Sequence, residues 1–214
     1  MTTKLALAKP VEDIWRDKLR PFVPRPALGY VARCMSRHPI ALKVTPHRKT
    51  KYGDYRPARD RREAHQISVN GDLMPERFLW TLMHELAHLF THIHFGSEVK
   101  SHGHEWKHCF DKLMQPLLRE EVFPKDILPI LSKHLHSAKA TSCSDLELHR
   151  AFLMIEGYTV TLLTDLPIGA MFQSEDGRHF VKLEKRRTRY LCKEVGTRKK
   201  FLVHGGAEVT HLDM

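Results

Sequence analysis

One segment constrains the fold of this chain more than any other: an apolar stretch at helical spacing that also carries two histidines and a glutamate. Between Pro75 and His92, apolar side chains recur three and four residues apart, which predicts one long amphipathic helix. Proline fits the first turn of such a helix, where its missing N–H has no role. A helix this apolar belongs in a core, so its polar side chains need partners, because unpaired buried polar groups are costly.

Within this helix, His84, Glu85 and His88 form the pattern H-E-x-x-H. Residues four apart lie on one face, about 6 Å apart along the axis, so two imidazoles can bind one metal ion. The pattern is typical of zinc hydrolases, in which the metal activates a water molecule and the glutamate accepts its proton. We therefore predict Zn²⁺ as the cofactor, with His84 and His88 as ligands and Glu85 as the general base.

A catalytic zinc ion usually has a third protein ligand and one open position. His92 continues the spacing of four, but a helical stripe drifts by about 40° per step, so it points away from a shared metal. His102 follows a loop and precedes Gly103, and a glycine lets the backbone approach the site closely. His102 is therefore the favoured third ligand. His104 stays an alternative ligand, and His104 or His108 could instead orient a ligand or stabilise an oxyanion.

The spacing of these residues resembles that of the SprT/Spartan family of zinc metalloproteases. The H-E-x-x-H segment is followed by a loop and then by a segment similar to that family's H-G-x-x-(F/W), His102-Gly103-His104-Glu105-Trp106. Residues ahead of the helix also resemble the family's strand layout: Lys43-Val44, Arg48, Gly53 and Ile67-Ser68-Val69. The resemblance covers about residues 10–120.

This resemblance implies a zincin-type fold with His102 as the third zinc ligand and Trp106 as a packing residue. It also implies a protease that cuts proteins bound or crosslinked to DNA, with activity promoted by DNA. The chain departs from the family at its C-terminal end. Many members carry a cysteine zinc ribbon there, but the four cysteines of this chain form no C-x-x-C pair.

The remaining patterns predict an α+β chain. We expect helices at residues 11–19, 28–36, 75–92, 104–118 and 125–136, and a three-stranded sheet at 41–45, 52–55 and 65–69. A capping box at 144–147 predicts a helix to about residue 156, followed by short strands at 158–163, 178–183, 188–193 and 201–204, with a hairpin turn at Asp176-Gly177. The predicted domains are a SprT-like metallopeptidase domain at 10–136, a linker at 137–145 and a basic β-rich module at 146–214.

The charge of the chain is positive and unevenly distributed. The net charge is +10, with 14 basic and 3 acidic residues between Arg16 and Arg62, and 10 and 4 between Glu175 and Lys200. Clusters of this kind suit a polyanion, most simply nucleic acid, although a solvated charged surface is the plainer interpretation. The candidate nucleic-acid contacts are Lys185, Arg186, Arg187, Arg189, Arg48, Lys49 and Lys51.

The expected partners are a protein substrate and DNA, single-stranded or containing a junction. No apolar run approaches the roughly 20 residues that span a bilayer, and the apolar stretch near Met1 is too short for a signal peptide. We therefore expect a cytoplasmic, DNA-associated monomer that is not secreted and has no membrane partner. Two other functions stay open: a zinc hydrolase acting on another amide, and a nucleic-acid-binding protein with a structural or non-proteolytic zinc site.

Overall fold

The computed structural model describes residues 9–48, 51–60, 62–136, 146–157 and 160–212. The chain divides into two compact units, Met1–Ala140 and Thr141–Met214. The predicted linker at 137–145 lies outside the described residues. None of the described helices is long and apolar enough to cross a membrane.

The first unit begins with two helices that precede its sheet, α1 (Val11–Leu19) and α2 (Arg25–Met35). They pack against each other, and their buried apolar residues include Trp15 and Val31. Helix α2 begins three residues before the predicted start. Pro26 lies in its first turn, where proline needs no hydrogen-bond partner, so the proline does not delay the helix as the sequence suggested.

The first unit contains a three-stranded sheet of β1 (Ile40–Thr45), β2 (Gly53–Arg56) and β3 (His65–Asn70). The strand order is β1-β3-β2, with β1 parallel and β2 antiparallel to the central β3. On β3, Ile67 and Val69 are buried, whereas Gln66 and Ser68 point to the opposite face. One face of the sheet is therefore apolar and the other polar.

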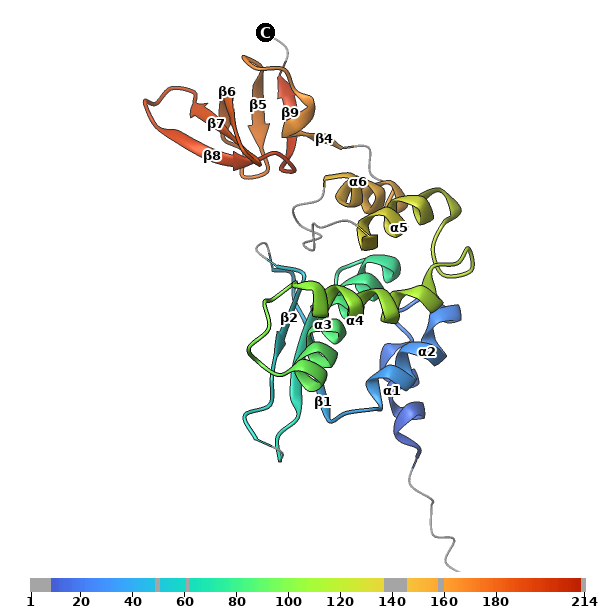
Figure 1. Ribbon diagram of the computed structural model, residues 1–214. Coiled ribbons are helices and arrows are strands. Elements are labelled where there is room, and N and C mark those ends of the chain that lie inside the picture. The colour runs from blue at the N-terminus through green and yellow to red at the C-terminus, as the bar shows by residue number, and fades with distance from the viewer. Residues whose placement is uncertain (1–8, 49–50, 61, 137–145, 158–159, 213–214) are drawn as a thin grey trace, which may run out of the picture. The chain divides into compact units, whose positions relative to one another are not determined.

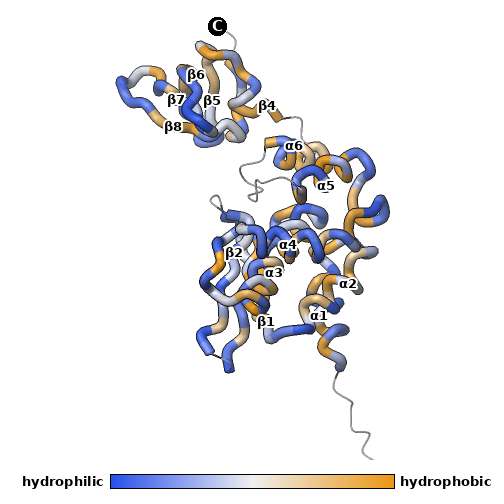
Figure 2. The backbone as a smooth tube through the Cα atoms, in the orientation of Figure 1, coloured by the Kyte–Doolittle hydropathy of each residue, from blue (hydrophilic) through white to orange (hydrophobic). Residues whose placement is uncertain are grey.

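Helix α3 (Pro75–Phe95) packs against β2 and β3, and α4 (His104–Met114) packs against α3 (Figure 1). Figure 2 shows alternating hydrophobic and hydrophilic stretches along these elements. Helix α3 continues three residues past its predicted end and stops at Gly96, whose φ of +79° suits a glycine. The predicted helix at 104–118 is wrong at its end, because Pro116 cannot continue the α-helical ladder and the chain tightens into a 3₁₀ turn, Gln115–Leu117. A second 3₁₀ turn, Lys125–Ile127, leads into α5 (Leu128–His136).

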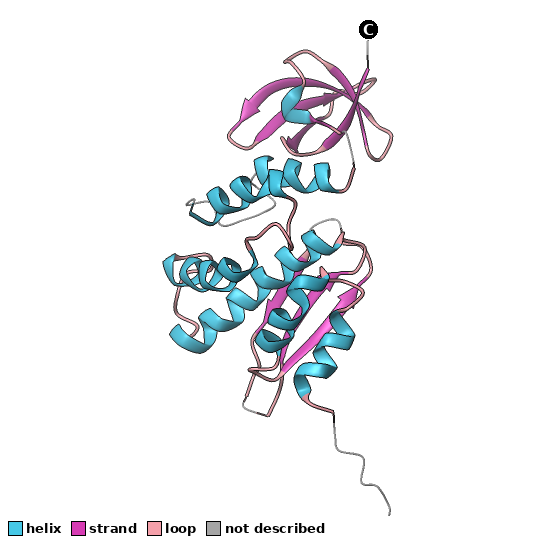
Figure 3. Ribbon diagram, turned by 90° about the vertical axis from the view of Figure 1, so that its right-hand side faces the viewer, coloured by secondary structure: helices cyan, strands magenta, loops and turns pink. Residues whose placement is uncertain are grey.

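The described residues of the second unit form one α-helix, α6 (Leu146–Ile155), a short 3₁₀ turn and a set of strands (Figure 3). The strands are β4 (Thr161–Leu162), β5 (Met171–Ser174), β6 (His179–Arg186), β7 (Arg189–Glu194), β8 (Lys200–His204) and β9 (Glu208–Leu212). They form one sheet in the order β4-β9-β5-β6-β7-β8, with a 3₁₀ turn at Leu163–Asp165. The core of this unit includes Phe172, Phe180 and Cys192.

The α+β prediction, with a small three-stranded sheet followed by a β-rich module, is confirmed. The Asp176-Gly177 turn joins β5 to β6, and Gly177 has a φ of +83°, as such a hairpin turn requires. Strand β9 has no counterpart among the predicted strands. It contains few apolar residues, and its place in the sheet depends on pairing with β4 and β5.

Candidate metal centre

Three histidines converge where α3 meets the residue that precedes α4. The Nε2 atoms of His84 and His88 lie 3.3 Å apart, and those of His84 and His102 lie 3.0 Å apart. The three ligand atoms all lie within 4.8 Å of one another. Ligands about 2.0–2.1 Å from a tetrahedral zinc ion are separated by roughly 3.3 Å. The cluster therefore has the dimensions of a metal site.

The surroundings of this cluster keep its imidazoles neutral, which is the form that binds a metal. Burial, reinforced by the neighbouring histidines, holds the pKa of His84 well below its ordinary value. Burial also lowers the pKa of His88 to about 4 and lowers the pKa of His102. Uncharged nitrogen atoms that face each other in a half-buried site suit a shared cation.

His102 reaches the cluster through an unusual backbone conformation. Its φ is +59°, a left-handed value that costs a residue with a side chain about 1–2 kcal/mol. The backbone freedom predicted at Gly103 lies instead at His102, since Gly103 has a φ of −68° and forms the N-cap of α4. A Cβ atom on Gly103 would lie 2.9 Å from the carbonyl oxygen of Lys100, so the glycine permits a close approach of two backbone segments.

Trp106 forms an aromatic floor for the histidines. It is 2% exposed, and its ring centroid lies 4.6 Å from that of His84 and 4.7 Å from that of His102. Phe110 stacks on the indole with ring centroids 4.8 Å apart, and its ring also lies 5.7 Å from that of His84. Trp106 therefore limits the positions that His84 and His102 can adopt.

Glu85 is buried beside the cluster, against the backbone of β2. It is 7% exposed, and a Cβ atom on Gly53 would lie 2.4 Å from its Oε1 atom. Burial raises the pKa of Glu85 to about 8, and the nearby Asp54 adds to this, while Arg48 and Lys51 act in the opposite direction. A carboxylate in this environment accepts a proton readily, which is the property of a general base.

Tyr55 is a further residue of this site that the sequence argument missed. Its ring lies parallel to that of His88, with centroids 6.3 Å apart, and its hydroxyl group lies 3.0 Å from Nδ1 of His65. Strand alternation could have indicated it, since Gly53 and Tyr55 share the face of β2 that points to α3.

The other histidines near the motif do not join the metal cluster among the described residues. The side chain of His104 is 90% exposed and pairs with Glu105 through Nδ1 and Oε2, 3.2 Å apart. His108 is exposed on α4. His92 packs against Tyr55 and His65, as expected for a position that rotates away from His84 and His88.

Two of the basic residues predicted in the first unit, Arg48 and Lys51, have partners within the protein. Arg48 donates hydrogen bonds to Oδ1 of Asn70 at 2.7 Å, to Oγ of Ser68 at 3.0 Å and to the carbonyl oxygen of Tyr52 at 3.2 Å. Lys51 pairs with Asp54 at 2.7 Å. Lys49 lies outside the described residues. Arg48 thus anchors the segment between β1 and β2.

The basic residues predicted in the second unit lie together at the tip of the β6–β7 hairpin. Lys185, Arg186, Arg187 and Arg189 are all exposed. Arg186 pairs with Glu184 and lies directly opposite Arg189 across the hairpin, while Arg187 has a φ of +55° in the turn. Like charges directly opposite each other are destabilising, so fold stability does not account for this arrangement.

Comparison with known proteins gives one match. The SprT-like family model matches residues 30–126. No curated protein and no solved structure matches the chain. The matched residues include β1, β2 and β3, α3, α4 and all of His84, Glu85, His88 and His102. The first unit of this protein therefore contains a SprT-like domain.

Proposed function

We propose that this protein is a zinc-dependent endopeptidase in which His84, His88 and His102 hold the metal and Glu85 is the general base. The observation that carries the proposal is the convergence of three neutral imidazoles beside a buried carboxylate. A structural zinc site is normally closed by four protein ligands. The cluster in the described part of the chain has three, which leaves one position for a substrate or water.

A bound zinc ion supplies Lewis-acid chemistry, because it polarises a carbonyl group and lowers the pKa of a coordinated water. The residues of the chain supply the proton transfers. A water molecule beside Glu85 gives up a proton to the carboxylate as its oxygen attacks the scissile carbonyl carbon. Glu85 then passes this proton to the amide nitrogen, which leaves as an amine when the C–N bond breaks. Gly53 and Trp106 restrict the carboxylate and the imidazoles to this geometry.

The substrates that we propose are proteins bound or crosslinked to DNA. We propose that the enzyme is cytoplasmic and contacts the same DNA while it cleaves them. The resemblance to the Spartan type of protease supports this proposal, and so does the basic hairpin tip of the second unit. We expect single-stranded or junction-containing DNA to be the nucleic-acid partner. The alternative is a nucleic-acid-binding protein whose zinc site has no proteolytic role.

The direct test measures the cleavage of a basic DNA-binding protein with no DNA, with single-stranded DNA and with duplex DNA. The variant Glu85→Gln removes the base without removing a ligand, so it should retain the metal and lose nearly all cleavage. The control Glu98→Gln makes the same chemical change on an exposed glutamate outside the site. Cleavage by Glu85→Gln at the parent rate would refute the mechanism. A parent protein that holds zinc but cleaves nothing under all three conditions would support the alternative.

The ligand set is tested by the metal content of purified protein. The parent should hold about one zinc ion per chain, and His102→Ala should hold much less. His104→Ala is the matched control, because His104 is close in sequence but its side chain is exposed. Zinc loss in His104→Ala with full occupancy in His102→Ala would transfer the ligand role to His104.

A further inference from the structure

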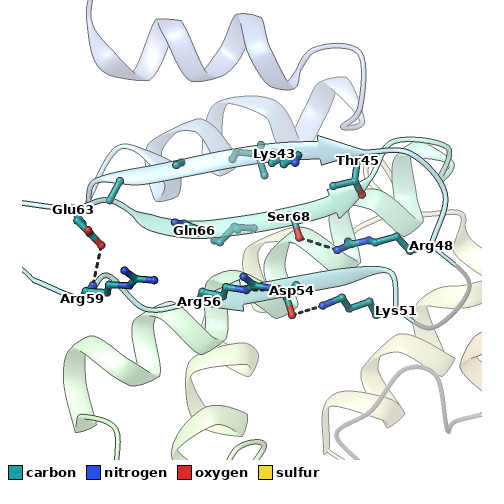
Figure 4. Close-up of a pocket in the computed structure, with 14 residues that line it drawn as sticks. Lys43, Thr45, Arg48, Lys51, Asp54, Arg56, Arg59, Glu63, Gln66 and Ser68 are labelled. Carbon is teal, nitrogen blue, oxygen red and sulfur yellow. Dashed lines mark hydrogen bonds and ion pairs between the residues drawn. The ribbon is translucent and has the colours of Figure 1, made fainter.

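The polar face of the three-stranded sheet carries a cavity of about 820 Å³ (Figure 4). Arg48 and Lys51, between β1 and β2, border one end of it. Arg59 and Glu63, between β2 and β3, border the other (Figure 4). We call this cavity the basic groove and define it by its lining residues: Ala41, Leu42, Lys43, Thr45, Arg48, Lys51, Asp54, Arg56, Arg59, Glu63, Ala64, Gln66, Ile67 and Ser68.

The basic groove and the metal centre share β2 as a wall. Successive side chains of a strand point to opposite faces. Gly53 and Tyr55 face α3, where they contact Glu85 and His88. Asp54 and Arg56 face the groove. A ligand in the groove is therefore separated from the catalytic carboxylate by the thickness of one strand.

The lining of the groove is strongly basic. It contains five basic and two acidic side chains. Asp54 is shared between Lys51 and Arg56, which lie 2.7 and 3.1 Å from its carboxylate oxygens. The other acid, Glu63, accepts a hydrogen bond from the backbone N–H of Arg59, not from its guanidinium group. Positive charges in a concave surface focus the electrostatic field and attract anions.

Three of the five cations have no carboxylate partner among the described residues. Arg48 is half-buried, and its three hydrogen bonds go to neutral oxygen atoms. A guanidinium group has five N–H donors, so two of those of Arg48 have no partner among the described residues. Lys43 and Arg59 are exposed and form no ion pair with another described residue. The groove therefore has charge and hydrogen-bond donors available for a bound anion.

The polar side chains on the floor of the groove favour phosphate over a protein segment. Gln66 and Ser68 lie two residues apart on β3 and both line the groove. Lys43, on β1, is paired with Ser68. A protein segment docks mainly by burying apolar and aromatic side chains, whereas phosphate groups bind arginine, lysine and neutral polar donors. Three of the five cations are arginines, whose planar groups bind phosphate through two parallel hydrogen bonds.

We propose that the basic groove binds the phosphate backbone of a nucleic acid, with Lys43 and Arg59 as direct contacts and Arg48 as the residue that shapes one end. This inference rests on the proposed function for its biological meaning, since it places a nucleic acid behind the strand that borders Glu85. The binding itself needs no catalysis and can be measured separately.

The test uses fluorescence anisotropy of labelled single-stranded and duplex oligonucleotides with the full chain, over a series of salt concentrations. The double variant Lys43→Ala/Arg59→Ala removes two exposed cations. For single strands, each lost phosphate contact should flatten the log–log salt slope by about 0.7, so the double variant should flatten it by about 1.4. Affinity at 0.1 M salt should fall by roughly tenfold or more. Repeating the pair in an Arg186→Ala/Arg189→Ala background removes the contribution of the hairpin tip.

The matched control is Arg25→Ala/Lys112→Ala, which removes the same charge from exposed positions outside the groove. This control should bind within about twofold of the parent, with an unchanged slope. An unchanged slope in Lys43→Ala/Arg59→Ala would overturn the proposal. So would displacement of the oligonucleotide by a polyglutamate peptide at lower concentration than by unlabelled DNA, because that result indicates an acidic protein partner. Neither outcome would affect the cleavage test of Glu85→Gln.

Discussion

Two basic segments that look alike in the sequence differ in what their cations do. Arg48 is half-buried and bonded to Asn70, Ser68 and the backbone of Tyr52, whereas Arg187 and its neighbours at the β6–β7 tip are exposed. The segment around Arg48 and Lys51 also lies close enough to Glu85 to affect its pKa. No described residue of the β6–β7 tip belongs to the metal cluster. Charge in a sequence therefore identifies cations but does not show which of them are available to a ligand.

The largest expected effect comes from the close approach between Gly53 of β2 and the side chain of Glu85. Gly53→Ala would place a Cβ atom 2.4 Å from Oε1 of Glu85, which is closer than two such atoms can approach. Glu85 or β2 must therefore move. A displacement of about 1 Å in a catalytic group can cost roughly a hundredfold in rate, and we expect a loss of that order with zinc content retained. Kinetics on a protein substrate and metal analysis check this. Gly29→Ala in α2 is the control, since its Cβ would meet no atom closer than 3.5 Å; equal activity in both variants would show that Glu85 tolerates the shift.

The second effect separates a structural arginine from an exposed one. Arg48→Ala leaves polar groups around the buried Asn70 without their donor, which should lower the free energy of unfolding by about 2–3 kcal/mol in urea titrations. Arg48→Lys keeps the charge but lacks the planar guanidinium fork whose three nitrogens reach Asn70, Ser68 and Tyr52, so it should also be destabilised. Lys185→Ala should stay within about 0.5 kcal/mol of the parent. If Arg48→Ala has the same free energy of unfolding as the parent, Arg48 is not a structural residue and does not differ in this respect from the exposed cations of the hairpin tip.

The third effect concerns DNA binding by the hairpin tip. Arg186→Ala/Arg189→Ala should flatten the salt slope for single-stranded DNA by about 1.4 if both side chains contact phosphate. It should leave zinc content unchanged, because the ligands belong to the other unit. The control Arg25→Ala/Arg33→Ala removes two exposed arginines of α2. Equal slopes for the two pairs would mean that the tip is a solvated surface, and that the groove of the first unit carries the binding.

The smallest effect tests the like-charge pair across the hairpin. Arg189→Thr removes the repulsion with Arg186 and introduces a residue that suits a strand, so stability should rise by about 0.2–0.5 kcal/mol. Arg198→Thr, in the exposed segment between β7 and β8, is the control for net charge. A loss of stability in Arg189→Thr would show that Arg189 has a structural role, and the contrast with Arg48 would disappear.

The helical part of the metal centre was predictable from the sequence because it depends only on local geometry. His84 and His88 share a face by the period of the helix, and Glu85 lies between them at a position that the same period defines. The prediction of a three-stranded sheet was also correct, since short alternating runs carry a local signal. The ends of helices were less predictable, as α2 shows. Its first turn contains Pro26, and a proline in the sequence indicates the interruption of a helix as often as its start.

Only the tertiary structure decided which residues from other segments reach this helix and which cations are available. Gly53 and Tyr55 reach Glu85 and His88 through the register of β2 on β3, and His102 reaches them through a left-handed backbone. The partners of Arg48 come from β3 and from its own loop. The sequence by itself determined the metal-binding residue types and their helical spacing. Long-range packing decided the rest, because strand register, loop conformation and hydrogen-bond partners depend on contacts between segments that no local pattern records.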